Sequence, residues 1–316
     1  MEGHALSIQL DTEPLIYGLD IGGTKIEIGV FSQDLELQDK WRVPTPSTNY
    51  SKLLDVIVQL VSDANNKYLQ QGLIGIGMPG ILDSNNSVVS ANVPCATGKN
   101  IVHDLENLLK ANISIGNDCR LFALSESNGG AAKGFERCYG AIIGTGAAGG
   151  LCIGGKLYLG KNGFAGEYGH QQASAYLINK YNLPLWKCGC GLVGCYESYI
   201  SGPGLGRIYH HFGSKSQDTR HFVKKLREND SIANETFHCY MDILGASFAS
   251  IVLSYDPDVI VVGGGISLID EVIFKLEEAV NAHLFSGVYC PPIKRANFGD
   301  SSGIRGAAIL RKQLVE

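Results

Sequence analysis

Short apolar runs alternate with stretches of helical apolar periodicity along this chain. Runs that are almost entirely apolar predict buried strands over residues 16–19, 26–31, 74–78, 113–116, 140–143, 149–153 and 259–262. Apolar residues at helical spacing predict helices over residues 53–69, 105–109, 121–128, 241–253 and 304–314. Strands that alternate with helices in this way indicate an α/β fold whose sheets are mostly parallel.

One local pattern occurs twice. Residues 16–31 and 140–153 each read as a strand, a glycine turn and a second strand. Dinucleotide-binding and Walker loops lead from a strand into a helix, so these turns are of another kind. The repeat predicts a duplicated architecture with a ligand-binding cleft between two α/β domains. The length of 316 residues also favours two domains over a single core.

Composition and charge disfavour several classes of protein. The chain is 45% hydrophobic and 18% charged, which is typical of a globular protein, and its net charge of −5 with no basic run disfavours nucleic acid and anionic membranes as partners. No Lys or Arg precedes Lys25, so a secretory signal is not expected. The longest uncharged apolar stretch, residues 139–155, is short for a membrane span and rich in glycine. We therefore expect a cytoplasmic protein, with residues 1–13 as a mobile leader.

The two glycine turns are candidates for binding phosphate. Gly22-Gly23-Thr24 and Gly144-Thr145-Gly146 offer backbone N–H groups with no side chain in the way, and each Thr adds a hydroxyl. Asp20 could orient a Mg²⁺ ion through water. Two ordinary hairpin turns are the alternative. The run at residues 263–265 could face an adenine or a ribose, although a strand-to-helix turn explains three glycines as well.

Three of the nine cysteines lie close together. Cys188, Cys190 and Cys195 are interleaved with glycine, a spacing that lets one loop wrap a tetrahedral zinc ion. His170, in a glycine-rich turn upstream, is the candidate fourth ligand, and four protein ligands would make the zinc structural. A disulfide plus a spare thiol is the alternative. The other six cysteines stand singly among apolar residues and are expected to be reduced thiols.

These motifs together resemble the ROK family (repressors, open reading frames and kinases). The resemblance rests on residues 20–25 (DIGGTK), residues 166–170 (GEYGH) and the cysteine segment 188–197, and it extends from about Tyr17 to the C-terminus. Within the family, residues 91–94, Gly98-Lys99 and Asn117-Asp118 are most similar to the N-acetyl-D-glucosamine kinases. The resemblance implies an actin/hexokinase-like (ribonuclease H-like) duplicated α/β fold. Its domains would be residues 1–117, joined by a C-terminal helix at 303–316, and residues 118–302 with the zinc loop.

The resemblance also implies an ATP-dependent kinase that phosphorylates the 6-hydroxyl of N-acetylglucosamine, with ATP, Mg²⁺ and structural Zn²⁺. Asp118 matches the catalytic base. The matching sugar contacts are Gly80, Asn92, Asn117, Asp118, Glu167, His170 and Glu197. The matching ATP residues are Gly18, Leu19, Asp20, Ile21, Gly22, Gly23, Thr24, Lys25, Gly144, Thr145, Gly146, Ala147, Ala148, Gly149, Gly150 and Leu151, to which the glycine run adds Gly264 and Gly265. The zinc ligands are His170, Cys188, Cys190 and Cys195, with the other edge of the His170 ring toward the sugar.

The residue chemistry leaves alternatives at several of these positions. Asp118 follows a strand and starts a helix, so it could be an N-cap, and the helix dipole is expected to lower its basicity. Glu167 and Glu197 can accept hydrogen bonds from sugar hydroxyls, or they could be solvated surface acids. Glucose, N-acetylmannosamine, fructose and allose remain open as substrates. A ROK-type repressor or sugar sensor is the non-enzyme alternative, and a homodimer is expected from the family.

Overall fold

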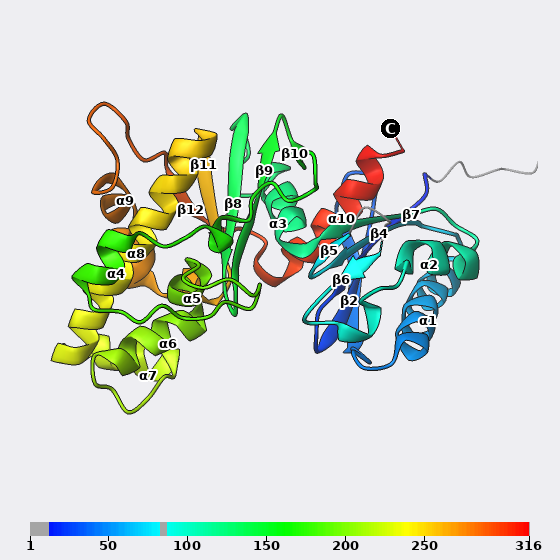
Figure 1. The fold of residues 1–316 in the computed structure, drawn as a ribbon. Helices are drawn as coiled ribbons and strands as arrows, with labels where there is room; N and C mark the ends of the chain where they lie inside the picture. Colours follow the sequence, from blue (N-terminus) through cyan, green and yellow to red (C-terminus); the bar gives the residue numbers. More distant parts are fainter. Residues whose placement is uncertain (1–12, 83–86, 316) are drawn as a thin grey trace, which may run out of the picture.

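The N-terminal half contains a five-stranded sheet in the order β3-β2-β1-β4-β7 (Figure 1). The computed structural model describes residues 13–82 and 87–315, so most of the expected leader at 1–13 lies outside the described residues. Strands β1 (Ile16–Ile21), β2 (Lys25–Phe31) and β3 (Leu37–Pro44) pair antiparallel, whereas β4 (Leu73–Met78) and β7 (Ile113–Asn117) run parallel to β1. Helices α1 (Tyr50–Tyr68) and α2 (Ile101–Leu109) and a small pair of strands, β5 (Ile81–Leu82) and β6 (Val88–Val89), complete this half.

The C-terminal half repeats the same topology. Its sheet has the order β10-β9-β8-β11-β12. Strands β8 (Arg137–Ile143), β9 (Ala147–Ile153) and β10 (Lys156–Tyr158) are antiparallel, and β11 (Val259–Gly263) and β12 (Ile293–Arg295) are parallel to β8. The duplicated architecture predicted from the strand–turn–strand repeat is therefore confirmed.

Helices α3 (Asp118–Ser127) and α10 (Ser302–Gln313) lie between the two sheets and contact each other (Figure 1). Helix α10 packs on β1 and β4, and α3 packs on β8 and β9. Two glycines permit this close approach. A Cβ atom at Gly18 of β1 would lie 1.8 Å from the carbonyl oxygen of Ile304, and one at Gly306 would lie 2.1 Å from that of Leu121. The connection between the halves is thus a pair of tightly packed helices.

The remaining helices belong to the C-terminal half. Helix α8 (Ser231–Tyr255) is long and apolar enough to cross a membrane, but 72% of its most apolar window is buried inside the fold, so it is a core helix and gives no evidence of a membrane protein. Around it lie α4 (Ala175–Lys180), α5 (Glu197–Ile200), α6 (Gly202–His211), α7 (Thr219–Arg227) and α9 (Asp270–Asn281). These helices build the larger of the two main hydrophobic cores.

Glu126, near the end of α3, is a fully buried carboxylate that joins α3 to the segment leading into α10. It accepts hydrogen bonds from the N–H groups of Ala131 (2.9 Å), Asn297 (3.0 Å) and Phe298 (3.0 Å) and from the Ser302 hydroxyl (3.0 Å). All four donors depend on one side chain, so its loss leaves buried polar groups without partners.

We expect Glu126→Ala to lower the free energy of unfolding by about 3–5 kcal/mol, because several buried donors lose their acceptor at once. Urea denaturation followed by circular dichroism measures this. Glu278→Gln, at a largely exposed helix position, is the matched control and should stay within about 0.5 kcal/mol of wild type. A Glu126→Ala variant as stable as the control would contradict the assigned role.

Candidate active site

The first glycine turn is held by the end of β3 and lies against the segment after β6. The Gly22 N–H donates to the Lys25 carbonyl oxygen at 2.8 Å, and the Thr45 hydroxyl donates to the Gly22 carbonyl oxygen at 2.7 Å. A Cβ atom at Gly23 would lie 2.8 Å from the backbone oxygen of Asn92. The structure thus brings together one candidate phosphate loop and one candidate sugar contact. Leu19 and Ile21, which flank Asp20, are fully buried, and their contact with a nucleotide stays a prediction.

The second glycine turn forms one wall of a cavity of about 1340 Å³. Gly144 and Thr145 line it together with Gly265, and the Gly202 N–H fixes the turn by donating to the Gly144 carbonyl oxygen at 2.8 Å. Gly264 does not line the cavity. Its φ is +81°, and a Cβ atom there would lie 2.4 Å from the Ile143 carbonyl oxygen, so its glycine is explained by packing.

The last residues of the predicted second ATP segment are buried. Gly149, Gly150 and Leu151 are buried in β9, and a Cβ atom at Gly150 would lie 2.9 Å from the Cα of Arg120. These residues pack β9 against α3. A contact between this part of the segment and ATP stays a prediction.

Asn117 is the residue that caps helix α3. Its Oδ1 accepts from the backbone N–H groups of Cys119 (3.0 Å) and Arg120 (3.3 Å), and its Nδ2 donates to the Gly80 carbonyl oxygen at 2.9 Å. Gly80 has a φ of +111°, which favours glycine. Two candidate sugar contacts, Asn117 and Gly80, are therefore joined by one hydrogen bond.

Because Asn117 caps the helix, Asp118 occupies its first turn. One oxygen of Asp118 accepts from the Cys119 N–H at 2.9 Å. Burial raises the pKa of the Asp118 carboxyl above its ordinary value, and this outweighs the hydrogen bond from Cys119 and the charge of Arg120. The interpretation of Asp118 as the N-cap was wrong, and so was the expectation that its position at the helix start lowers its basicity. A carboxylate with a raised pKa is a better general base.

A buried ion pair lies beside Asp118. Arg120 is 3% exposed, and its guanidinium donates to Oε1 of Glu167 at 3.0 Å. Glu167 directly precedes the short 3₁₀ helix η2 (Tyr168–His170), and its Oε2 lies 4.0 Å from Nε2 of His170. Glu167 is therefore not a solvated surface acid. Arg120 also lines a cavity of about 150 Å³ together with Gly80, Asn117 and the ring of Phe164.

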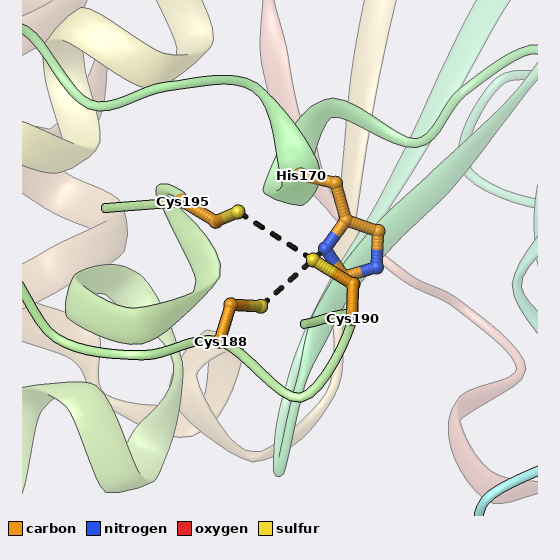
Figure 2. A group of neighbouring side chains, drawn as sticks. All are labelled: His170, Cys188, Cys190 and Cys195. Atoms are coloured by element: carbon orange, nitrogen blue, oxygen red, sulfur yellow. Dashed lines mark hydrogen bonds between the residues drawn. The ribbon is translucent and has the colours of Figure 1, made fainter. Parts of the chain in front are cut away.

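The three cysteines and His170 converge on one point (Figure 2). The Cys188 sulfur lies 3.6 Å from His170 Nδ1, the Cys190 and Cys195 sulfurs lie 3.7 Å apart, and all four ligand atoms lie within 4.8 Å of one another. No disulfide forms, and all nine cysteines are free thiols. Around a tetrahedral ion with Zn–S bonds of about 2.3 Å, sulfurs lie about 3.8 Å apart. The separations therefore fit a four-coordinate metal ion.

Comparisons with known proteins agree with this geometry. The model of the ROK family matches residues 16–314. This chain is a member of the ROK family. It is 50% identical to an N-acetylgalactosamine kinase, AgaK, of Shewanella sp. (strain ANA-3), over 94% of this chain and 96% of the relative. It is 39% identical to an N-acetyl-D-glucosamine kinase of Vibrio atlanticus (strain LGP32), over 94% and 99% of the two chains.

A solved ROK structure is also similar. The ROK family glucokinase from Streptomyces griseus, in complex with glucose and AMPPNP, aligns with a TM-score of 0.76 and 27% identity over 95% of this chain and 99% of the other. The predicted actin/hexokinase-like fold is thus confirmed, and this ROK protein is an ATP-dependent sugar kinase. The sensor and repressor alternatives are set aside.

Some site residues of this ROK kinase were missed from the sequence. Basic side chains from α6 and α7 line the 1340 Å³ cavity beside Thr145, namely Arg207, Arg220, Lys224 and Arg227. Residues 220–227 hold four cations, which do not form a continuous basic run and were not singled out. Arg120 was also missed, because its partner Glu167 lies 47 positions along the chain and no local pattern marks the pair.

Glu197, at the start of α5, has both oxygens engaged by protein groups. Its Oε2 accepts from the Ala147 N–H at 2.9 Å, and its Oε1 accepts from the Cys188 thiol at 3.5 Å. Glu197 therefore links the cysteine loop to the second glycine turn. Its contact with a sugar stays a prediction.

Proposed function

We propose that this ROK kinase transfers the γ-phosphate of ATP to the 6-hydroxyl of an N-acetylhexosamine, and that N-acetylgalactosamine is its preferred substrate. The observation that carries this choice is the 50% identity to AgaK over almost the whole chain, against 39% for the N-acetylglucosamine kinase. The smaller motifs around residues 91–99 favoured N-acetylglucosamine, which remains the second candidate. The two sugars share the acetamido group and differ only in configuration at C4.

The proposed roles rest on the family resemblance, and parts of the geometry support them. Asp118 accepts the proton of the attacking hydroxyl, and its raised pKa supports that role. Gly80, Asn92, Asn117, Glu167, His170 and Glu197 form the sugar wall. The first turn, residues 18–25, and the second turn, residues 144–151, bind ATP together with Gly265, while Gly264 supports that turn by its packing on Ile143. Asp20 orients Mg²⁺ through water. Phosphoryl transfer of this kind depends mostly on positioning and charge neutralisation, which these groups can supply.

We also propose a zinc ion held by His170, Cys188, Cys190 and Cys195. Three thiolates and an imidazole are ligands that zinc prefers, and a closed set of four supports a structural ion that fixes the loop. His170 would bind through Nδ1, which lies nearest the Cys188 sulfur, and would keep Nε2 toward Glu167. The ion would supply rigidity and hold the His170 tautomer.

The division into residues 1–117 with 303–316 and residues 118–302 is retained as a proposal. The repeated sheets support it, with α10 packed on the N-terminal sheet and α3 on the C-terminal one. A cytoplasmic homodimer is proposed from the family.

The sugar choice is tested by ADP release from Mg-ATP with N-acetylgalactosamine, N-acetylglucosamine, N-acetylmannosamine, galactose and glucose in parallel. We expect kcat/KM for N-acetylgalactosamine to exceed that for N-acetylglucosamine by about 10-fold or more, since a hydrogen bond that depends on C4 configuration discriminates by at least that factor. Both should exceed the free hexoses. A preference for N-acetylglucosamine would keep the kinase and reverse the C4 assignment. A preference for glucose or galactose would show that the enzyme does not select the acetamido group.

A further inference from the structure

Arg120 is a buried cation in the middle of the candidate active site, and none of the roles proposed above uses it. It lies in the first turn of α3, two residues after Asp118, with 3% of its side chain exposed. Arginine is almost never buried to this extent unless it is paired. Its partner is Glu167, from a segment 47 positions along the chain, at 3.0 Å.

Stability alone gives a weak account of this arginine. Of its donors, Nε is buried and has no hydrogen-bond partner. Burying a cation carries a large desolvation cost, and an unsatisfied buried donor adds to it. A non-polar side chain of similar size would fill the space next to Phe164 without that cost. The arrangement is therefore better explained by what the guanidinium does for its neighbours.

The neighbour that the guanidinium controls is Glu167. Arg120 occupies Oε1 and thereby fixes the carboxylate about its terminal torsion, leaving Oε2 on the side of His170, 4.0 Å from its Nε2. Glu167 follows Gly166, whose φ of +112° places it in a turn. The backbone of this turn does not fix the direction of the Glu167 side chain by itself. One hydrogen bond thus decides which oxygen of Glu167 is available to a ligand.

We propose that Arg120 is a positioning residue of the sugar site: its guanidinium holds Oε1 of Glu167 so that Oε2 is presented to a sugar hydroxyl. Arg120 is assigned to act through Glu167, because its Nε is buried and its Nη2 is engaged by Oε1 of Glu167. The inference deepens the proposed function and rests on Glu167 being a sugar contact. It does not depend on which sugar is the substrate.

The test compares Arg120→Met, Arg120→Lys and the control Arg137→Met by steady-state kinetics, with whichever sugar the wild type phosphorylates best. Arg137 is half-exposed at the end of β8 away from the Gly144 turn and pairs with Asp258 at 2.7 Å. We expect Arg120→Met to raise the sugar KM at least about 10-fold and to leave the ATP KM within about 2-fold, because only the sugar contact is disordered. Arg120→Lys should lie between Arg120→Met and wild type, since a single hydrogen bond can be made by an ammonium group.

A double-mutant cycle with Glu167→Gln separates positioning from general stability. If Arg120 acts through Glu167, the sugar KM of Arg120→Met/Glu167→Gln should equal that of Glu167→Gln alone. The double variant carries no unpaired buried charge, so it remains informative if Arg120→Met folds poorly. Additive effects, or equal rises in the sugar and ATP KM, would overturn the proposal. A Glu167→Gln variant with an unchanged sugar KM would show that Glu167 is not a sugar contact. This outcome would contradict the proposed function and is distinct from one that contradicts only the role of Arg120.

Discussion

Asp118→Asn should lower kcat by about 10³-fold while the KM values for sugar and ATP stay within a few-fold of wild type. The amide keeps the shape of the carboxylate and can still accept from the Cys119 N–H, so binding is preserved. It cannot accept the proton of the attacking hydroxyl, and general base catalysis is worth about 10²–10⁴-fold. Because burial raises the Asp118 pKa, the acidic limb of the wild-type kcat/KM profile should lie above pH 4, where a solvated aspartate titrates.

The measurement is coupled ADP release over a pH series, with Asp63→Asn as the matched control. Asp63 is exposed on α1, where its carboxylate accepts a hydrogen bond from the Gln59 side chain of the same helix. The control should reproduce both the rate and the acidic limb of wild type. An Asp118→Asn variant with full kcat, or with an unchanged acidic limb, would show that another group accepts the proton.

The central strands and the duplicated topology could be predicted from sequence because these buried strands are nearly continuous apolar runs. β3 was missed because its residues alternate between half-buried and exposed, as on a sheet edge, and read as polar. Helix α8 starts ten positions before the expected 241, since Asp230 caps it by accepting from the Ala233 N–H. The cap residues carried this information, but the apolar spacing was read alone.

The site was predicted where a motif places its residues close together in sequence. The three cysteines lie on one loop, and Asn117 and Asp118 are adjacent at the end of one strand. The Arg120–Glu167 pair could not be found this way, because it joins α3 to the segment before η2 and only the folded chain brings them together. The same holds for Glu197, whose contact with Ala147 links residues 50 positions apart.

Loss of one cysteine of the cluster should remove the metal and with it most of the sugar affinity. Cys190 is the ligand to replace, because it is exposed and Cys190→Ser creates no cavity in the core. Purified wild type is expected to contain one zinc per chain by elemental analysis, and Cys190→Ser much less. We expect kcat/KM for the sugar to fall by about 100-fold, since changes around metal sites cost up to that factor even outside the ligand set.

The reason for this effect lies in the connections of the loop. His170 is three positions after Glu167, and Cys195 is two positions before Glu197, so a released loop frees two carboxylates of the proposed sugar wall and the anchor of the Ala147 N–H. The ATP KM should therefore rise less than the sugar KM, because residues 144–146 are also held by Gly202. Cys290→Ser, at a partly buried thiol outside the cluster, is the control and should keep both zinc and activity. Wild type that is active without zinc, or Cys190→Ser that retains both, would show that protein contacts alone hold the loop.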